Sequence, residues 1–294
     1  LENENDEPER AKMLLARARE RATDKPRVWM KSAKLEREQG RRDQEKEILD
    51  EGLQRFADYD KLWLMLGQYM EDQQDFLGAK QKYVQGIKAC PECVALWLSL
   101  VRLELDGKVP GGGVNTARAI LEKARLKNTG QETLWHKAVQ VEVKAGNDKI
   151  ASQLLAKGIS DCPKSGLLWA QAIAMEPRAQ RKAKSVDALK RCENDPIVIA
   201  TVAKLFWDDR KLEKARAWFN RAVTLNTDYG DNWAMYYKFE LAHGDEDKRK
   251  AVEKRCLDAE PTHGPLWCGV SKAPESFKLT KIQILKKVAA LLDD

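Results

Sequence analysis

Cys90 and Cys93 form the motif that most resembles a reactive site, because a Cys-x-x-Cys pair can serve as a redox couple or as half of a zinc site. A redox role needs a thioredoxin-like βαβ setting, and a zinc site needs a second ligand pair; the sequence has neither. Cys162-Pro163 repeats the start of the motif without a second cysteine. We therefore interpret these cysteines, together with Cys192 and Cys256, as small buried thiols, and expect no metal site.

The other side chains able to do acid–base or nucleophilic chemistry are scattered. The only histidines are His136, His243 and His263, and no two are spaced as ligands on one helix. None pairs recognisably with a Ser or Cys nucleophile. The sequence also lacks a phosphate-binding loop, a nucleotide fingerprint and a paired-carboxylate signature. We therefore predict no catalytic residue, no cofactor-binding residue and no cofactor, and an enzyme is the weakest of the functional hypotheses.

Tryptophan spacing divides the chain into repeats. The same interval separates tryptophans 29 and 63, 63 and 97, 135 and 169, and 233 and 267, while the step from 97 to 135 is slightly longer. The recurring interval matches the period near 34 that is typical of helix-turn-helix repeats. One further unit, with Val202 in the Trp slot, fills the gap between 169 and 233. We expect the repeat tryptophans to be structural; they are Trp29, Trp63, Trp97, Trp135, Trp169, Trp233 and Trp267.

A carboxylate follows the Trp by seven residues in five units, and this spacing puts both side chains on one face of a helix. We expect each to pair with an Arg or Lys of a neighbouring helix and so to fix the angle between the two helices. General acid chemistry is the less favoured interpretation. The five residues are Glu36, Glu104, Glu142, Glu176 and Glu240.

Each unit is predicted to consist of helix A with the Trp, a turn, helix B, and a turn with proline. Glycines eleven residues after the Trp, at Gly40, Gly146 and Gly244, are placed to end helix A. Prolines near the unit boundaries, such as Pro163, cannot continue helix B. The insert 109–113 predicts a longer turn. The fold class predicted is all-α, a right-handed superhelical solenoid of about seventeen helices without strands.

The repeats extend over the whole chain, which predicts a single array of about eight helical pairs over residues 1–294. The array should start with a lone helix B at 8–22 and finish in an irregular capping end at 271–294. We expect the last helix of this end to run from Phe277 to Leu292. The chain has no initiator Met and opens on a helix B without its helix A, so we expect it to be a fragment of a longer protein. No apolar run is long enough for a membrane span, and six cysteines without a secretion signal indicate a reducing compartment.

Net charge is mild, at +6 from 52 basic and 46 acidic residues, so nucleic-acid binding is open but not indicated. A second basic run, 248–255, is interleaved with acidic residues and is more readily interpreted as a solvated face. The candidate partner-binding residues lie in the predicted helix B of the fifth unit; they are Arg178, Arg181, Lys182 and Lys184. A solvated helix face without a partner is an equally favoured interpretation of these four residues.

The repeat resembles the half-a-tetratricopeptide (HAT) repeat, in which Trp is followed by Glu, helix B begins Ala-Arg as at Ala117-Arg118 and Ala215-Arg216, and a Pro closes the unit. Stretches outside that consensus are similar to the C-terminal repeats of the pre-mRNA-processing factor 6 family. These stretches are 117–123, 184–190, 202–207 and 259–268. The chain departs from the family pattern in the insert 109–113 and in the tail after Ala273.

The resemblance implies a nuclear, non-catalytic scaffold for pre-mRNA splicing. In the spliceosomal tri-snRNP such a scaffold would bridge the U5 particle and the U4/U6 particle through protein–protein contacts. Two alternatives stay open: direct RNA binding through basic helix faces, which predicts a continuous basic stripe and steep salt dependence, and self-association through the terminal repeats.

Overall fold

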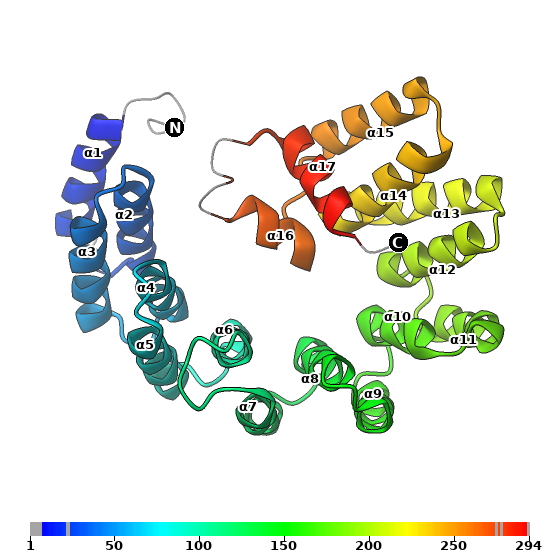
Figure 1. Cartoon of the computed structure of the whole chain (residues 1–294). Coiled ribbons are helices and arrows are strands. Elements are labelled where there is room, and N and C mark those ends of the chain that lie inside the picture. Colours follow the sequence, from blue (N-terminus) through cyan, green and yellow to red (C-terminus); the bar gives the residue numbers. More distant parts are fainter. Residues whose placement is uncertain (1–7, 22–23, 274–275, 277–278, 293–294) are drawn as a thin grey trace. The chain divides into compact units, whose positions relative to one another are not determined.

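The chain is almost entirely helical. The computed structural model describes residues 8–21, 24–273, 276 and 279–292. These residues form seventeen α-helices (Figure 1), which confirms the all-α fold and the helix count predicted from the repeats. The same described residues hold no strand, only an isolated bridge between Tyr229 and His263. None of their helices is long and apolar enough to cross a membrane.

The helices that precede Gly40, Gly146, Gly244 and Pro163 end within two residues of those predicted turns. The helices are α1 Pro8–Arg21, α2 Pro26–Glu38, α3 Arg42–Arg55, α4 Asp60–Asp72, α5 Phe76–Ala89, α6 Val94–Leu105, α7 Val114–Lys127, α8 Glu132–Lys144, α9 Asp148–Asp161, α10 Gly166–Met175, α11 Arg178–Arg191, α12 Pro196–Asp208, α13 Leu212–Leu225, α14 Gly230–His243, α15 Glu246–Ala259, α16 Pro265–Ser271 and α17 Lys281–Leu291. Residue 22 of the predicted first helix lies outside the described residues.

Contacts group the chain into two units, residues 1–151 and 152–294, and the boundary falls inside α9. In unit 1, α2 packs with α3, α4 with α5, and α6 with α7; in unit 2, α10 packs with α11, α12 with α13, and α14 with α15. Each helix A also contacts the helix A of the next repeat, from α2 to α8 and from α10 to α16. Within each unit the A helices therefore form the inner layer of the curve and the B helices the outer layer (Figure 1).

The hydrophobic core runs from repeat to repeat inside each unit. In unit 1, Trp63 packs both against the cluster that contains Trp29 and against the next cluster, around Tyr83. In unit 2, Phe206 and Trp218 connect the cluster of Trp169 to that of Trp233 in the same way. Each unit is thus a helical-repeat solenoid whose repeats bury their apolar faces against their neighbours.

In most repeats the turn after helix A contains one residue in the left-handed region. Gly40 and Gly146 have φ of +72° and +73° there, as the glycine pattern predicted. Gln74 occupies the equivalent turn with φ +62°, where a side chain is strained. Gly244 departs from the prediction, because it ends α14 with an ordinary φ of −94°. A Cβ there would meet the carboxylate of Glu240 instead.

Replacing Gln74 with glycine should stabilise unit 1 by ~1 kcal/mol, since glycine adopts a positive φ without the clash that Cβ introduces. Urea unfolding of the two chains measures the difference. Gly40→Ala is the matched control and should destabilise the chain at the same turn position. A Gln74→Gly variant that unfolds at lower urea than the parent chain would contradict the strain argument.

The glycine-rich insert is a turn between α6 and α7, as predicted. Its Val109 side chain is buried against the core of unit 1, which fixes the loop. Gly112 lies so close to Glu104 that a Cβ would come within 2.9 Å of the Glu104 carbonyl oxygen. The loop therefore covers one end of the Glu104 side chain, and Gly112 is the residue that permits this approach.

The C-terminal end departs from the repeat pattern. After the short α16, a last helix α17 packs against α14, α15 and α16 and buries Ile284, Leu285 and Val288. This helix begins at Lys281 rather than at Phe277, the predicted start, because Thr280 caps it: the Thr280 hydroxyl accepts from the Gln283 amide N–H while Gln283 accepts from the Thr280 N–H. Residues 277–278 lie outside the described residues.

Candidate functional site

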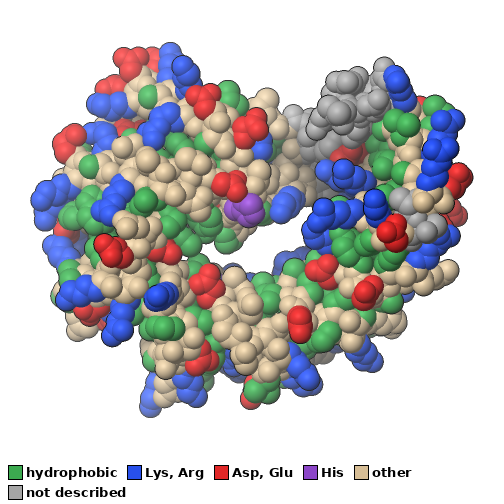
Figure 2. Space-filling model, turned by 180° about the vertical axis from the view of Figure 1, so that it is seen from behind, with side chains coloured by type: hydrophobic (Ala, Val, Ile, Leu, Met, Phe, Trp, Pro, Cys, Tyr) green, Lys and Arg blue, Asp and Glu red, His purple; other side chains and the backbone are tan. Residues whose placement is uncertain are grey.

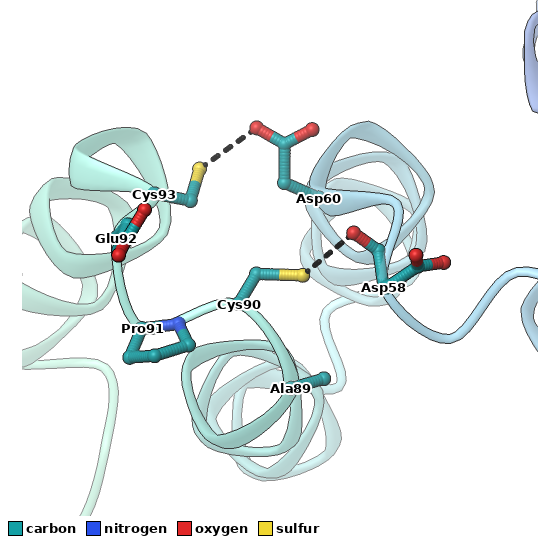
Figure 3. Close-up of a pocket in the computed structure, with 7 residues that line it drawn as sticks. All are labelled: Asp58, Asp60, Ala89, Cys90, Pro91, Glu92 and Cys93. Carbon is teal, nitrogen blue, oxygen red and sulfur yellow. Dashed lines mark hydrogen bonds between the residues drawn. The ribbon is translucent and has the colours of Figure 1, made fainter.

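Cys90 and Cys93 lie in the turn between α5 and α6, beside an open pocket of about 480 Å³ (Figure 3). The Cys93 thiol donates to Asp60 Oδ2 at 3.0 Å, and the Cys90 thiol donates to the Asp58 carbonyl oxygen at 3.2 Å. Burial and the neighbouring Asp60 carboxylate raise the pKa of Cys93 to about 11, and burial raises the pKa of Cys90. Both thiols are therefore protonated at neutral pH and are poor nucleophiles and poor ligands.

The three histidines belong to separate local environments. His136 lies on α8 with its Nε2 3.5 Å from Gln140 Nε2. His243 ends α14 and accepts a hydrogen bond of 2.7 Å from Trp207 Nε1, and His263 contacts Asp228 in the turn before α16. The described residues contain no group of three or more His, Cys, Asp or Glu side chains placed to hold a metal ion.

The repeat tryptophans anchor helix A to the turn that precedes it. In four repeats the indole Nε1 donates to the carbonyl oxygen six residues upstream: Trp63 to Ala57 at 2.8 Å, Trp97 to Pro91 at 2.8 Å, Trp169 to Pro163 at 3.0 Å, and Trp233 to Thr227 at 2.7 Å. Five of the seven indoles are buried, and those of Trp63 and Trp135 are half-buried. The Arg125 guanidinium covers the Trp135 ring at 4.4 Å.

A small residue lies three positions before the last residue of each B helix from α3 to α15. A Cβ on Gly52 would come within 3.0 Å of the Trp29 ring, and one on Gly86 within 2.8 Å of Trp63 Cβ. The small side chain therefore lets the Trp of helix A approach helix B closely. This position was not predicted from the sequence, although it recurs with nearly the same period as the Trp. It holds Gly52, Gly86, Ala124, Gly158, Ala188, Ala222 and Cys256, all buried.

Four of the five predicted glutamates are almost fully buried and pair with a cation of the preceding helix B. Glu36 pairs with Lys12 at 3.2 Å, Glu104 with Lys80 at 2.8 Å, Glu142 with Arg118 at 2.6 Å, and Glu240 with Arg216 at 2.7 Å. The two residues stand at the same sequence separation in all four pairs. Each cation follows a buried alanine, so the Ala-Arg start of helix B is one half of this contact. The Ala-Lys pairs at 11–12 and 79–80 belong to the same pattern and were missed.

Glu176 is the exception. Pro177 ends α10 early, so Glu176 is the residue that follows the helix rather than one inside it. Its carboxylate lies 3.3 Å from Lys184 of the following helix, α11, and is 27% exposed. Position 152, where the pattern would place the cation of the preceding helix B, is a serine. The fifth glutamate therefore joins the two helices of one repeat, whereas the other four join successive repeats.

Removing Arg118 should destabilise unit 1 most at neutral pH. The hydrogen bonds from Arg118 hold the pKa of Glu142 below its usual range. A carboxyl group with a lowered pKa in the folded state stabilises that state above its unfolded pKa, and the contribution disappears as the pH falls through the folded pKa. Arg118→Met should therefore unfold at lower urea at pH 7, and the gap should shrink below about pH 4.

Urea titrations at pH 7 and at pH 3 measure this effect. Lys123→Met, on the same helix, is the control. A gap of constant size between pH 7 and pH 3 would show that Arg118 acts through packing alone.

The basic side chains at the start of α11 are used inside unit 2. Arg181 donates to the carbonyl oxygens of Glu176 at 2.9 Å and Ala174 at 3.3 Å, which are left without helical partners where α10 ends. Arg178 donates to the carbonyl oxygen of Asp208 at 3.3 Å, and Lys182 pairs with Asp209 at 2.8 Å. These candidate partner-binding residues thus have a structural task at the joint between α10, α11 and α12. The side chain of Lys182 is 67% exposed.

The paired helices, the buried Trp and the Glu–cation contacts define an all-α helical-repeat protein. No protein-family model matches the chain. Pre-mRNA-splicing factor prp1 of Schizosaccharomyces pombe is 40% identical over 219 residues, which is 74% of this chain and 24% of that protein. Pre-mRNA-processing factor 6 of Homo sapiens is 55% identical over 112 residues, 38% of this chain and 12% of that protein. Pre-mRNA-splicing factor 6 of Saccharomyces cerevisiae is 28% identical over 229 residues, 76% of this chain and 25% of that protein.

The chain is homologous to pre-mRNA-processing factor 6 and to prp1. It spans about a quarter or less of the length of these curated relatives. Among solved structures, a tetratricopeptide repeat protein from Parabacteroides merdae has 14% identity and a TM-score of 0.49, over 82% of this chain and 94% of that one. The assignment rests on the relatives and on the repeat geometry.

Proposed function

We propose that the chain is a non-catalytic scaffold for pre-mRNA splicing, acting in the nucleus through protein–protein contacts. Homology to proteins named as pre-mRNA splicing and processing factors carries the proposal. We further propose that the repeats form one array and that this array bridges the U5 particle and the U4/U6 particle of the tri-snRNP. The buried Trp residues and the Glu–cation pairs fix the helices relative to their neighbours, so the exposed side chains keep fixed positions. The scaffold therefore loses little conformational entropy when a partner binds.

Direct RNA binding is the second candidate, and the structure gives it less support than the charge count did. The basic residues of α11 are engaged in contacts within unit 2. On the face drawn in Figure 2, Lys and Arg side chains are interspersed with Asp and Glu rather than joined in one stripe. A sequence-independent clamp on phosphates needs a continuous basic track.

A pull-down from nuclear extract separates the two candidates. The tagged chain is incubated with and without RNase, and retained proteins are identified by mass spectrometry. Retention of U5 and U4/U6 proteins after RNase is the expected result. Retention that disappears with RNase would place RNA binding first and would make Lys182 of α11 the residue to substitute.

A further inference from the structure

Cys90 and Cys93 are the first and last residues of one tight turn. The Cys93 N–H donates to the Cys90 carbonyl oxygen at 3.1 Å, which closes a β-turn between α5 and α6. A turn of this kind holds its two end Cα atoms less than about 7 Å apart. Disulfides usually join Cα atoms that are about 4.4–6.8 Å apart. The backbone of this turn therefore already suits a bond between the two sulfurs.

Both thiols point to the segment that leads into α4, in the preceding repeat (Figure 3). The Cys93 thiol donates to the Asp60 carboxylate, and the Cys90 thiol donates to the Asp58 carbonyl oxygen. These two hydrogen bonds join the α5–α6 turn to the α3–α4 turn. A disulfide has no S–H group and would remove both hydrogen bonds. This part of the joint between two repeats therefore depends on the thiols being reduced.

Two other turns of the chain begin with a cysteine but lack the second thiol. The turns Cys162–Ser165 and Cys192–Asp195 are closed by the same hydrogen bond, at 3.1 and 3.2 Å. Ser165 and Asp195 each cap the following helix with the side chain, whereas the Cys93 side chain does not cap α6. Position 93 thus lacks the stabilising cap of the two matching positions and holds a second thiol beside the first.

The two sulfurs are accessible but slow to react. Both side chains are partly exposed and line the open pocket of about 480 Å³, so a small thiol reagent can reach them. Burial raises the pKa of Cys90, and burial and Asp60 raise that of Cys93 to about 11. Protonated thiols exchange slowly with disulfides. The pair is therefore suited to reversible modification and not to redox catalysis.

We propose that Cys90 and Cys93 form a reversible modification site, which a low-molecular-weight disulfide such as oxidised glutathione converts into a protein disulfide, releasing the α5–α6 turn from the α3–α4 turn. Cys90 reacts first, because its partner is a neutral carbonyl group, whereas Cys93 faces a carboxylate that disfavours the thiolate.

The reaction is a pair of thiol–disulfide exchanges. The Cys90 thiol loses its proton to water and its sulfur attacks one sulfur of glutathione disulfide, so that one glutathione thiolate leaves. The Cys93 sulfur then attacks the Cys90 sulfur, gives up its proton and displaces the second glutathione thiolate. Two protein thiols are oxidised, and one glutathione disulfide is reduced to two glutathione molecules.

The Asp60 carboxylate should set the balance between the two forms, because its hydrogen bond stabilises the reduced pair. Asp60→Ala should shift the midpoint of a titration with reduced and oxidised glutathione about tenfold toward the more reducing mixtures, the factor expected for one hydrogen bond. Asp58→Ala is the matched control and should shift the midpoint less, since Cys90 bonds the backbone of Asp58. No shift for Asp60→Ala, or equal shifts for the two variants, would overturn the contact through Cys93.

Peptide mapping by mass spectrometry, after incubation with oxidised glutathione, identifies the bond. The parent chain and Cys162→Ser should both form the disulfide between Cys90 and Cys93. Cys90→Ser and Cys93→Ser keep a hydroxyl donor at the turn and should form only a mixed disulfide with glutathione at the remaining cysteine. Mixed disulfides alone in the parent chain, or a bond from this turn to any other cysteine, would overturn the proposal.

Hydrogen exchange on the oxidised chain tests the release of the turn. The amides of Tyr59 and Leu62 are hydrogen-bonded within the segment that leads into α4, and they should lose protection on oxidation and regain it on reduction. The Leu134 amide, bonded to Gln131 in a turn without cysteine, is the control and should keep its protection. Unchanged protection at Tyr59 and Leu62, or an equal loss at Leu134, would overturn the release.

Discussion

Replacing Trp233 with alanine should destabilise unit 2 by ~3–5 kcal/mol, the usual cost of truncating a buried Trp. The indole is 2% exposed, donates to the Thr227 carbonyl oxygen at 2.7 Å, and packs in one cluster with Cys256 and Phe219. Truncation therefore opens a cavity between the two helices of the repeat and also removes the hydrogen bond that anchors α14 to its turn. Urea unfolding followed by far-UV circular dichroism measures the loss.

Hydrogen exchange on the same variant shows where the loss falls. Repeats contact only their neighbours, so protection should fall most in α12–α15 and least in the distant helices α2–α5. Leu257→Ala on α15, where the side chain is 43% exposed, is the control and should change little. Equal loss of protection at every amide would contradict a solenoid built from local contacts.

Breaking the Arg216–Glu240 pair on one side should destabilise unit 2 by ~3 kcal/mol, because Arg216→Ala leaves a buried carboxylate without its partner. Glu240 is 1% exposed and accepts from Arg216 Nε at 2.7 Å and from Nη2 at 3.2 Å. Losing one partner is far more costly than losing the pair as a whole. The double variant Arg216→Met with Glu240→Leu removes both charges and should recover most of the lost stability.

Urea midpoints of the single and double variants test this contact. If the double variant is as unstable as Arg216→Ala, the pair contributes through its shape and not through compensation of the buried charge. Glu213→Ala serves as the control, since that side chain bonds the same guanidinium but is 88% exposed.

The fold was largely predictable because the repeat signals are local. The Trp period, the prolines and the apolar stripes predict a first helix at 8–22 without reference to distant residues, and the structure has α1 at Pro8–Arg21. The start of α17 was misplaced because the apolar residues Phe277 and Leu279 extend the helical pattern, whereas the start is decided by the capping box at Thr280. Gly244 was misinterpreted because glycine suits both a left-handed turn and a close approach to Glu240.

The site was less predictable because its contacts cross between helices. The kind of partner for the repeat glutamates could be expected, but its position at the start of the preceding helix B needed the stacking geometry to be known. The basic start of α11 looks like a free surface in sequence, yet Pro177 leaves carbonyl groups at the end of α10 that Arg181 binds.

Reconstitution without RNA tests the central claim most directly. The purified chain is mixed with RNA-free preparations of the splicing proteins that it captures, and assembly is followed by analytical ultracentrifugation. A scaffold that works through protein contacts predicts a stable complex whose formation is unaffected by added RNase. A complex that forms only when small nuclear RNA is supplied would contradict the account and would establish the chain as an RNA-binding module instead.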